Sequence, residues 1–517
     1  MKTRDKSVQH GISVTFLLIL LALGGCATLP ANNNRSHSTV LQGDWSNNKT
    51  LSIADSVVEI PPDKSGVYLL TTGLDAFAAR GALIKMARVG LDIQYYLLHN
   101  DLTGQLLIHE IAKAADRGVR IRLLLDDMGL SGRDMGFVTL DSHPNIEIRI
   151  FNPFSRNVSR TSQLISRFGS VTRRMHNKSI TADNVLSIVG GRNIGNEYFS
   201  ANPVVNFGDL DVLVAGKVVP EISRSFDEYW NSPYSYPVTT LIGDEITISY
   251  SELHNKLANI YQDAAQSEYA RALGSTNLVR KVEEASLQFD WVDAKLYSDP
   301  PSKISQPKDA GPVSLLTDVG KHLNQTRQEL LIVSPYFVPG KNGVAFLKAL
   351  VDKGVRVRIL TNSLASNDVA VVHSGYAKYR KPLLRAGVEL YEFDSSAVSG
   401  DVRSTKKGSQ ASLHAKSFIM DREKIFIGSL NLDPRSVYEN TEIGLVFTSP
   451  TYGQLIGQQF DRDILPHTFS LKLVDNRIQW VIGEGDAERI YSVEPYTSFW
   501  SRFGVWLMSL LPIESQL

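Results

Sequence analysis

Residues 176–183 read His-Asn-Lys-Ser-Ile-Thr-Ala-Asp, and residues 414–421 read His-Ala-Lys-Ser-Phe-Ile-Met-Asp. Both stretches have a histidine, a lysine two positions later and an aspartate five positions after the lysine: His176, Lys178 and Asp183, and His414, Lys416 and Asp421. The residues between Lys and Asp alternate like a β-strand, which places each His and Lys on one strand face. Asp183-Asn184 and Asp421-Arg422 then fit hairpin turns, so the Asp residues are expected to be partly architectural.

The similarity between the two halves extends beyond this motif. A Gly-rich turn ending in Asn follows each histidine at the same distance, as Gly190-Gly191 with Asn193 and as Gly428-Ser429 with Asn431. Residues 116–123 also match residues 352–359, at nearly the same offset as the histidines. The repeated unit is therefore a whole lobe. These residues resemble the phospholipase D superfamily, and the resemblance covers nearly all of the mature chain.

Strand and helix patterns alternate within each half. Strand-like residues 91–97, helical residues 106–115 and strand-like residues 119–125 return in the second half at 330–333, 346–351 and 355–360. These patterns predict an α/β fold of two pseudo-symmetric lobes, each a mixed β-sheet flanked by helices, with the active site at the lobe interface. We expect lobe 1 at 65–235, a helical connector at 236–312, lobe 2 at 313–465 and a C-terminal extension at 466–517. Ser249 and Glu252 predict a capping box for a connector helix.

The overall composition excludes some partners. Lys plus Arg and Asp plus Glu number 54 each, so no global field attracts nucleic acid, and no nucleic-acid partner is expected. The hydrophobic fraction of 43% is that of an ordinary globular protein. No internal stretch approaches the ~18 apolar residues of a membrane-spanning helix.

The amino terminus predicts a bacterial lipoprotein. Three basic residues precede an apolar run at 12–23, which is too short to span a bilayer but fits a secretory signal at 1–25. The run ends in Leu-Gly-Gly-Cys26, which resembles a lipobox, and Cys26 is the only cysteine. We expect lipidation at Cys26, a polar tether at 26–64 and a periplasmic protein anchored to a membrane. Ala27 favours the outer membrane over the inner one.

The superfamily resemblance implies a two-histidine mechanism on a phosphodiester. One neutral imidazole attacks phosphorus and the other donates a proton to the departing alkoxide. We assign the first role to His176 and the second to His414. The resemblance also makes the other motif residues, Lys178, Asp183, Lys416 and Asp421, candidate catalytic residues. The donors that neutralise and orient the phosphate are Lys178, Lys416, Asn193 and Asn431, with Ser429 beside them. No metal or other cofactor is then needed.

An imidazole nucleophile needs a fixed tautomer, which a carboxylate on its other ring nitrogen can set. Glu442, eleven residues beyond Asn431, occupies the position where superfamily members carry such a Glu. In the first half the matching segment places Asp209 in that role, after a five-residue insertion. Glu197 is the competing candidate, and the choice between Asp209 and Glu197 stays open.

Finer features narrow the family. Residues 190–199, 428–436 and 510–517 look like those of the bacterial cardiolipin synthase C group, which joins two phospholipids into cardiolipin. The resemblance implies a phosphatidyltransferase that uses phosphatidylglycerol and a second phospholipid, either phosphatidylethanolamine or phosphatidylglycerol, at a membrane surface. A hydrolase of the phospholipase D type remains an alternative, and a secreted nuclease or an inactive scaffold fits less well. The aromatic tail at 499–511 favours a membrane-interface helix over a core helix.

Overall fold

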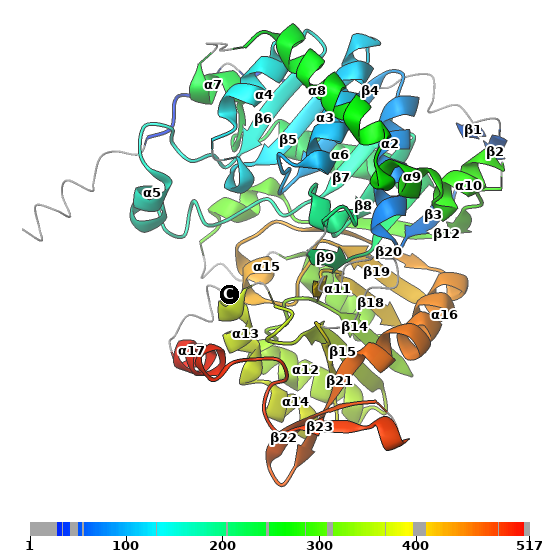
Figure 1. Cartoon of the computed structure of the whole chain (residues 1–517), viewed down its shortest axis with the longest axis vertical. Coiled ribbons are helices and arrows are strands. Elements are labelled where there is room, and N and C mark those ends of the chain that lie inside the picture. The colour runs from blue at the N-terminus through cyan, green and yellow to red at the C-terminus, as the bar shows by residue number, and fades with distance from the viewer. Residues whose placement is uncertain are drawn as a thin grey trace, which may run out of the picture.

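The computed structural model describes the chain from Thr28 to Leu510, apart from short gaps at 34, 42–49, 54–55, 131, 203–204, 244–247, 285, 308–313, 368, 396–409 and 484. Two lobes are stacked along the longest axis of the molecule (Figure 1), with the first half of the chain in the upper lobe and the second half in the lower one. Within the described residues, no helix is both long and apolar enough to cross a bilayer. The signal at 1–25 and Cys26 lie outside the described residues.

Lobe 1 is built on a nine-stranded mixed sheet of order β11-β6-β5-β4-β7-β8-β10-β3-β12. Its strands are β3 (Ser65–Leu70), β4 (Gly90–Tyr95), β5 (Arg120–Asp126), β6 (Ile146–Phe151), β7 (Ser179–Ala182), β8 (Leu186–Gly190), β10 (Asp211–Gly216), β11 (Ser235–Pro237) and β12 (Asp290–Val292). The helices are α2 (Gly73–Met86), α3 (Leu102–Asp116), α4 (Asp134–Asp141), α5 (Arg160–Ser166), α6 (Val219–Trp230) and α7 (Val238–Ile242). β4, β5 and β6 run parallel, and β7 pairs antiparallel with β4.

Lobe 2 repeats this arrangement in a ten-stranded sheet of order β13-β20-β19-β18-β14-β15-β16-β21-β22-β23. Its strands are β13 (Ala294–Ser298), β14 (Glu329–Val333), β15 (Arg356–Asn362), β16 (Glu389–Phe393), β18 (Ser417–Met420), β19 (Lys424–Gly428), β20 (Ile443–Thr448), β21 (Thr468–Val474), β22 (Arg477–Ile482) and β23 (Arg489–Tyr491). The helices are α11 (Leu315–Leu323), α12 (Gly340–Asp352), α13 (Ala370–Ala377), α14 (Arg380–Arg385), α15 (Pro434–Tyr438), α16 (Pro450–Gln459) and α17 (Phe499–Ser509). The shared order confirms the two-lobed α/β prediction.

Three of the predicted segments contain contacts or strands that the sequence did not indicate. The tether predicted at 26–64 is not free along its length, because Ser38 and Val40 hydrogen-bond to lobe 1 and a hairpin of β1 (Thr50–Ile53) and β2 (Ser56–Glu59) follows. The connector at 236–312 contains β12 and β13, which join the sheets of lobe 1 and lobe 2 respectively. The extension at 466–517 begins with β21, β22 and β23, which complete the lobe 2 sheet.

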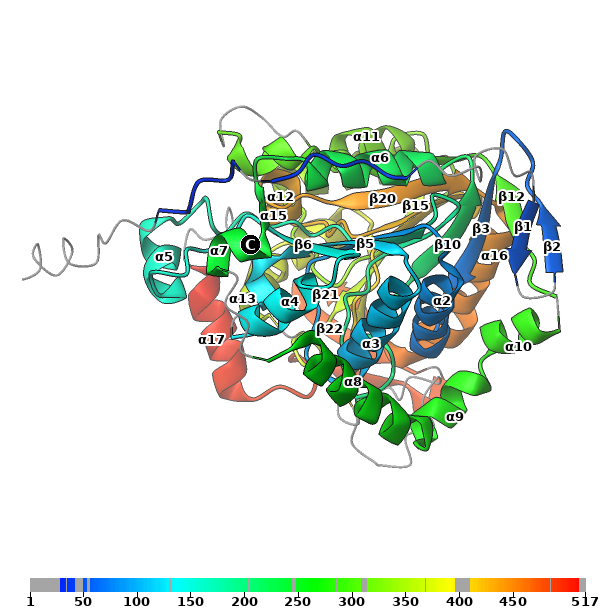
Figure 2. The ribbon, with the colours of Figure 1, turned by 90° about the horizontal axis from the view of Figure 1, so that it is seen from above.

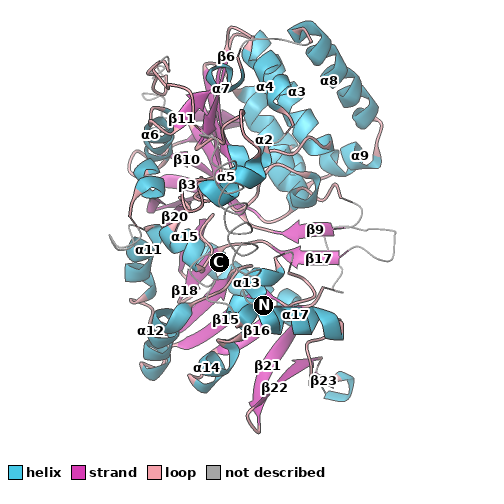
Figure 3. Cartoon of the chain, turned by 90° about the vertical axis from the view of Figure 1, so that its left-hand side faces the viewer, coloured by secondary structure: helices cyan, strands magenta, loops and turns pink. Residues whose placement is uncertain are grey.

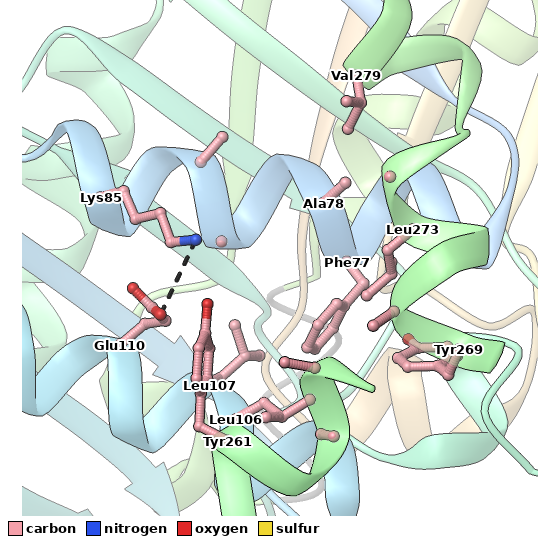
Figure 4. A pocket seen from close by; sticks show the side chains of 16 residues that line it. Phe77, Ala78, Lys85, Leu106, Leu107, Glu110, Tyr261, Tyr269, Leu273 and Val279 are labelled. Carbon is pink, nitrogen blue, oxygen red and sulfur yellow. Dashed lines mark ion pairs between the residues drawn. The ribbon is translucent and has the colours of Figure 1, made fainter. Parts of the chain in front are cut away.

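The connector also contains three helices, α8 (Tyr250–Ala265), α9 (Glu268–Gly274) and α10 (Asn277–Glu283). α8 begins with the predicted capping box, in which the Ser249 and Glu252 side chains each accept from the other residue's backbone N–H. The connector helices lie over α2 and α3 (Figure 2) and leave between them an apolar cavity of about 410 Å³ (Figure 4). At one end of this cavity Lys85 lies 3.9 Å from Glu110.

The two lobes share a buried core. Apolar residues from β3, β8 and β10 of lobe 1 pack against residues from β14, β18, β19 and β20 of lobe 2, including Val189, Val212, Ile419, Ile425 and Leu445. A second link is a parallel pair of short strands, β9 (Val205–Gly208) of lobe 1 and β17 (Gln410–Leu413) of lobe 2, which lie side by side in Figure 3. Burial of this apolar surface fixes the lobes in one relative position, which a site built from both lobes requires.

Candidate active site

The two histidines lie at equivalent places in the two sheets. In lobe 1 the first residue of β7, Ser179, pairs with Gln94 near the carboxyl end of β4. His176 and Lys178, which directly precede β7, therefore lie at that end of β4. In lobe 2 Ser417 of β18 pairs with Val333 at the carboxyl end of β14, directly after His414 and Lys416. Both histidines and both lysines are buried, which the sequence alone could not show for four polar side chains.

The orienting carboxylates cross between the lobes. His176 Nδ1 lies 2.9 Å from Oε2 of Glu442, which belongs to lobe 2. His414 Nδ1 lies 2.6 Å from Oδ2 of Asp209, which belongs to lobe 1. Sequence analysis left the choice between Asp209 and Glu197 open; Asp209 contacts the histidine of the opposite lobe, whereas Glu197 pairs with His99 at 3.1 Å. Each histidine therefore has its orienting carboxylate only when both lobes are present.

Hydroxyl groups hold Glu442 in place. Ser429 Oγ donates to Glu442 Oε2 at 2.5 Å, and Ser436 Oγ of α15 donates to Oε1 at 2.7 Å. Ser429, expected near the phosphate, thus contacts the orienting carboxylate. The Glu442 backbone N–H also donates to Asp299 Oδ2 at 2.9 Å. A fully buried carboxylate with this many donors is fixed in position and stays ionised.

Asp209 is held differently. Its Oδ1 accepts from the backbone N–H of Leu210 at 2.8 Å. Gly191, which corresponds to Ser429 in the repeat, lies directly beside it, and a Cβ added at Gly191 would lie 2.3 Å from Asp209 Oδ1. The absence of a side chain at Gly191 therefore makes room for the carboxylate. This contact gives a physical reason for glycine at that position of the first repeat.

Nδ1 of each imidazole is occupied by a carboxylate, so Nε2 is the nitrogen left for a substrate. Each lysine ammonium group lies close to the histidine of its own motif. Lys178 Nζ donates to the His176 carbonyl oxygen at 2.5 Å, and Lys416 Nζ lies 3.3 Å from His414 Nε2. Four of the predicted site residues, the His and Lys of each motif, are thus brought together with both carboxylates around one point of the lobe interface.

The two predicted asparagines differ. Asn193 is already engaged, because its Oδ1 accepts from the Leu97 backbone N–H and its Nδ2 donates to the Tyr198 hydroxyl at 2.9 Å. Asn431 is 5% exposed, and within the described residues its Oδ1 has no hydrogen-bond partner. A buried amide oxygen without a partner is costly, and a bound ligand can compensate for it.

Aromatic rings enclose the histidines. The Tyr96 ring lies edge-on to His176 with centroids 5.1 Å apart, Tyr198 lies edge-on to His414 at 5.1 Å, and Phe207 stacks on His414 at 5.4 Å. Sequence analysis missed Tyr198 and Phe207. Phe207 belongs to β9, in the segment between Asn193 and Asp209 that is five residues longer than its counterpart in the second repeat, so this extra length was the available signal.

Burial controls the charges in the site. It lowers the pKa of His176 and of His414 to about 4, against the opposing effects of Glu442 and Asp209. It also lowers the pKa of Lys178 to about 7, with Lys416 adding to the shift. Although burial opposes it, the nearby His176 and Lys178 hold the pKa of Glu442 below its ordinary value. The substrate-free site therefore combines neutral imidazoles with ionised carboxylates at pH 7.

The two motif aspartates lie far from the histidines. Asp183 accepts from the backbone N–H groups of residues 88–90, and Asp421 accepts from those of 327–329, just before β4 and β14. Both sit in turns with positive φ at two successive residues, after strands that carry them roughly 16 Å along the sheet from the lysine. These contacts account for the architectural role that the turn pattern indicates for Asp183 and Asp421, and the catalytic role predicted for them stays a prediction.

One group of side chains in the described part of the chain has metal-ligand composition: His99, Asp101 and Glu197, whose ligand atoms lie within 4.8 Å of one another. Asp101 caps α3 through Gly104 and accepts from the Asn196 backbone N–H, while Glu197 pairs with His99. These contacts account for the cluster as part of the packing between α3 and the turn after Asn193. The cluster therefore gives no reason to propose a metal ion in the reaction.

A two-lobed sheet protein with paired His-x-Lys motifs at the lobe interface is a phospholipase D-like enzyme by fold and site. Residues 82–230 and 319–464 match the family model described as cardiolipin synthase, PLD-like domain. The chain belongs to this family. Each matched range covers the central strands of one lobe, and the motifs of both lobes lie inside the matched ranges.

Individual relatives agree with this assignment. The chain is 42% identical over 461 residues to cardiolipin synthase C of Escherichia coli K12, covering 88% of this chain and 96% of the relative. It is 33% identical over 448 residues to an uncharacterized protein of Helicobacter pylori J99, covering 85% and 87%. The crystal structure of phosphatidylserine synthase from Haemophilus influenzae Rd KW20 superposes with a TM-score of 0.52 at 16% identity, covering 79% and 88%, which supports the shared fold.

Proposed function

We propose that this protein is a phosphatidyltransferase that makes cardiolipin from phosphatidylglycerol and a second phospholipid through a phosphohistidine intermediate. The observation that carries the proposal is the pair of buried imidazoles, each held at Nδ1 by a carboxylate of the opposite lobe. The likeness to cardiolipin synthase C over most of both chains supports this substrate class.

In the first step Nε2 of His176 attacks the phosphorus of the donor phospholipid. A P–N bond forms, the P–O bond to the head-group alcohol breaks, and His414 donates a proton to the departing oxygen. His414 must be protonated for this step, although burial lowers its pKa to about 4 in the substrate-free protein. The anionic phosphodiester raises that pKa when it binds, so the substrate itself supplies the charge that makes His414 an acid.

In the second step His414, now neutral, takes the proton from a glycerol hydroxyl of phosphatidylglycerol. The hydroxyl oxygen attacks phosphorus, a new P–O bond forms and the P–N bond to His176 breaks. Lys178, Lys416 and Asn431 lie where donors can neutralise the phosphoryl oxygens through both steps. Water in place of the alcohol would give hydrolysis and phosphatidic acid.

The membrane is the proposed partner surface, and the exposed aromatic residues of α17 support it. Phe499, Trp500 and Trp506 are 63%, 75% and 54% exposed, although α17 packs against α13. In lobe 1, Ile165 of α5 and the nearby Phe168 are 70% and 59% exposed. Figures 1 and 2 both place α5 and α17 on the same side of the molecule. Aromatic and aliphatic side chains exposed in this way are typical of a membrane interface.

The contacts of Thr28 are consistent with a lipid anchor on the same side of the molecule as α5 and α17. Ser155, shortly before α5, donates to the carbonyl oxygen of Thr28, the first described residue. One residue separates Thr28 from Cys26, so lipid attached to Cys26 would be tethered within about 7 Å of that point. We therefore propose a lipoprotein facing the periplasm, with the outer membrane favoured. In cell fractions, Cys26→Ser should release the protein from membranes or block its processing; unchanged attachment would assign the anchoring to α17.

The activity test uses the full chain in vesicles with labelled phosphatidylglycerol, with and without phosphatidylethanolamine. Labelled cardiolipin in either mixture supports the transferase, and comparison of the two mixtures identifies the donor. Phosphatidic acid as the sole product would favour the hydrolase. The assay is run with and without EDTA, and we expect equal rates; loss of activity with EDTA that a divalent ion restores would contradict the two-histidine mechanism.

A further inference from the structure

Lobe 2 contains an apolar cavity of about 730 Å³ that the mechanism does not use. It lies between α11, α12, α15 and the segment that joins β14 to α12. Its walls are mostly apolar and include Leu316, Leu323, Phe337, Phe346, Leu432 and Val437. This volume and apolar lining lie within the range of small-molecule sites, which usually hold ~300–1,000 Å³.

The cavity adjoins the turn after β19 that contains Asn431. Leu432 and Asp433, which follow Asn431 directly, both line it, and the Leu432 carbonyl oxygen accepts from the Val338 backbone N–H at 2.7 Å. α15 separates the cavity from the orienting carboxylate. Ser436 of this helix donates to Glu442, while the next residue, Val437, lines the cavity. A ligand in the cavity is therefore one helix away from the group that orients His176.

The lining also has a polar end. Lys341 and Asn342, at the start of α12, are exposed and line the cavity, whereas Leu323, Ile332 and Leu347 are buried. The buried aliphatic walls suit a long apolar chain, and the polar residues are confined to the exposed edge. A phospholipid supplies such a chain.

We propose that this cavity holds an acyl chain of the phospholipid whose phosphate occupies the two-histidine site. The inference rests on the proposed function for the identity of that phospholipid. The lining residues of α11, α12 and α15 would then determine which acyl-chain lengths the enzyme accepts. The enzyme would recognise its lipid by an acyl chain as well as by the phosphate. The cavity of lobe 1 (Figure 4) is also apolar but is lined by α2, α3 and the connector helices and has no lining residue from the catalytic loops.

Two helical glycines provide a matched test. Gly320 of α11 lines the lobe 2 cavity, Gly81 of α2 lines the lobe 1 cavity, and a Cβ added at either position would meet no atom within 4 Å. Gly320→Leu and Gly81→Leu each insert the same side chain into an apolar space, and each replaces a glycine by a better helix former. Thermal unfolding should show that neither variant has a lower Tm than the original protein.

Kinetics are measured with dihexanoyl phosphatidylglycerol, which is soluble as a monomer, and with dioleoyl phosphatidylglycerol in mixed micelles. Gly320→Leu should raise KM for the dioleoyl lipid by about tenfold or more, because the inserted side chain displaces methylenes of the acyl chain. It should leave kcat and KM for the dihexanoyl lipid unchanged. Gly81→Leu should change neither. Unaltered dioleoyl KM in folded Gly320→Leu, or an equal rise in both variants, would overturn the proposal.

A variant that enlarges the cavity keeps the test decisive if Gly320→Leu does not fold. Phe346→Ala should shift the chain length of lowest KM toward longer lipids, and an unshifted optimum would also contradict the proposal. Failure of the proposed function has a different signature. If the protein only hydrolyses lipids, phosphatidic acid replaces cardiolipin, yet the chain-length effects of Gly320→Leu and Phe346→Ala persist.

Discussion

The two lobes support their carboxylates in different ways. In lobe 1 the shorter Asp209 fits against Gly191, which has no side chain, and in lobe 2 the longer Glu442 is held by the hydroxyls of Ser429 and Ser436. Aromatic packing differs too, because among the described residues two rings, Tyr198 and Phe207, contact His414, whereas one ring, Tyr96, contacts His176. The repeats are therefore equivalent in backbone but not in the surroundings of the two imidazoles. This inequality gives a basis for dividing nucleophile and acid between them.

The sharpest test of this division is removal of each imidazole. His176→Ala and His414→Ala should each lower turnover by several orders of magnitude, since the acid–base contribution alone is about 10²- to 10⁴-fold. With a labelled donor carrying an activated leaving group such as nitrophenol, and an alkaline denaturing quench, His414→Ala should accumulate label on His176. Label on His414 in the His176→Ala protein, with none on His176 in the reciprocal variant, would reverse the assignment.

The crossed carboxylates predict a paired effect on opposite lobes. Glu442→Gln and Asp209→Asn keep the side-chain shape but remove the charge, and each should lower turnover on the order of 10²- to 10⁴-fold. With the same activated donor, Glu442→Gln should slow formation of the His176 adduct. Asp209→Asn should allow the adduct to form and slow its transfer to the acceptor. The opposite pattern, measured by rapid quench, would show that each carboxylate serves the histidine of its own lobe.

A smaller effect is expected from the glycine and serine beside the carboxylates. Gly191→Ala forces Asp209 to move, because the new Cβ would lie 2.3 Å from its Oδ1, and kcat should fall by roughly tenfold or more. Ser429→Ala removes one hydrogen bond to Glu442 while Ser436 still donates, so its kcat should fall by less than about tenfold. Steady-state kinetics at saturating lipid compare the two. A larger loss in Ser429→Ala would mean that the hydroxyl also contacts substrate.

The motif aspartates should affect stability with little effect on catalysis. Asp183→Ala and Asp421→Ala each leave three backbone N–H groups without their acceptor, and the free energy of unfolding should fall by about 1–3 kcal/mol. Denaturant titration measures the loss, with Asp183→Asn as a control that keeps an acceptor. Turnover per folded molecule should stay nearly unchanged. A large loss of turnover with unchanged stability would support the catalytic role for the aspartate concerned.

Local pattern predicted the fold in those segments where one strand or helix is determined by its own residues. The duplicated strand–helix–strand series appeared as β4, α3 and β5 and again as β14, α12 and β15. The Asp-led turns after β7 and β18 appeared with positive φ, as their residue types indicate. The strands β21 to β23 were missed, because the sheet edge that they extend is defined only by the pairing of β21 with β16.

The site was predictable in its residue types but not in its pairing. His176, Lys178, His414 and Lys416 follow from the motif, and Glu442 and Asp209 follow from their position after each Asn. Which carboxylate meets which histidine depends on how two lobes dock, and a sequence contains no local signal for contacts across more than 200 residues. The same reason applies to Phe207, whose place against His414 requires β9 to pair with β17.

The exchange of carboxylates between lobes has a consequence for the order in which the protein is made. The amino-terminal lobe leaves the ribosome first, with a histidine whose Nδ1 partner has not yet been synthesised. Until the chain has been synthesised as far as Glu442 and the second lobe has docked on the first, neither imidazole has its carboxylate. The chemistry therefore requires both lobes, and an incomplete chain lacks the contacts that orient its histidines.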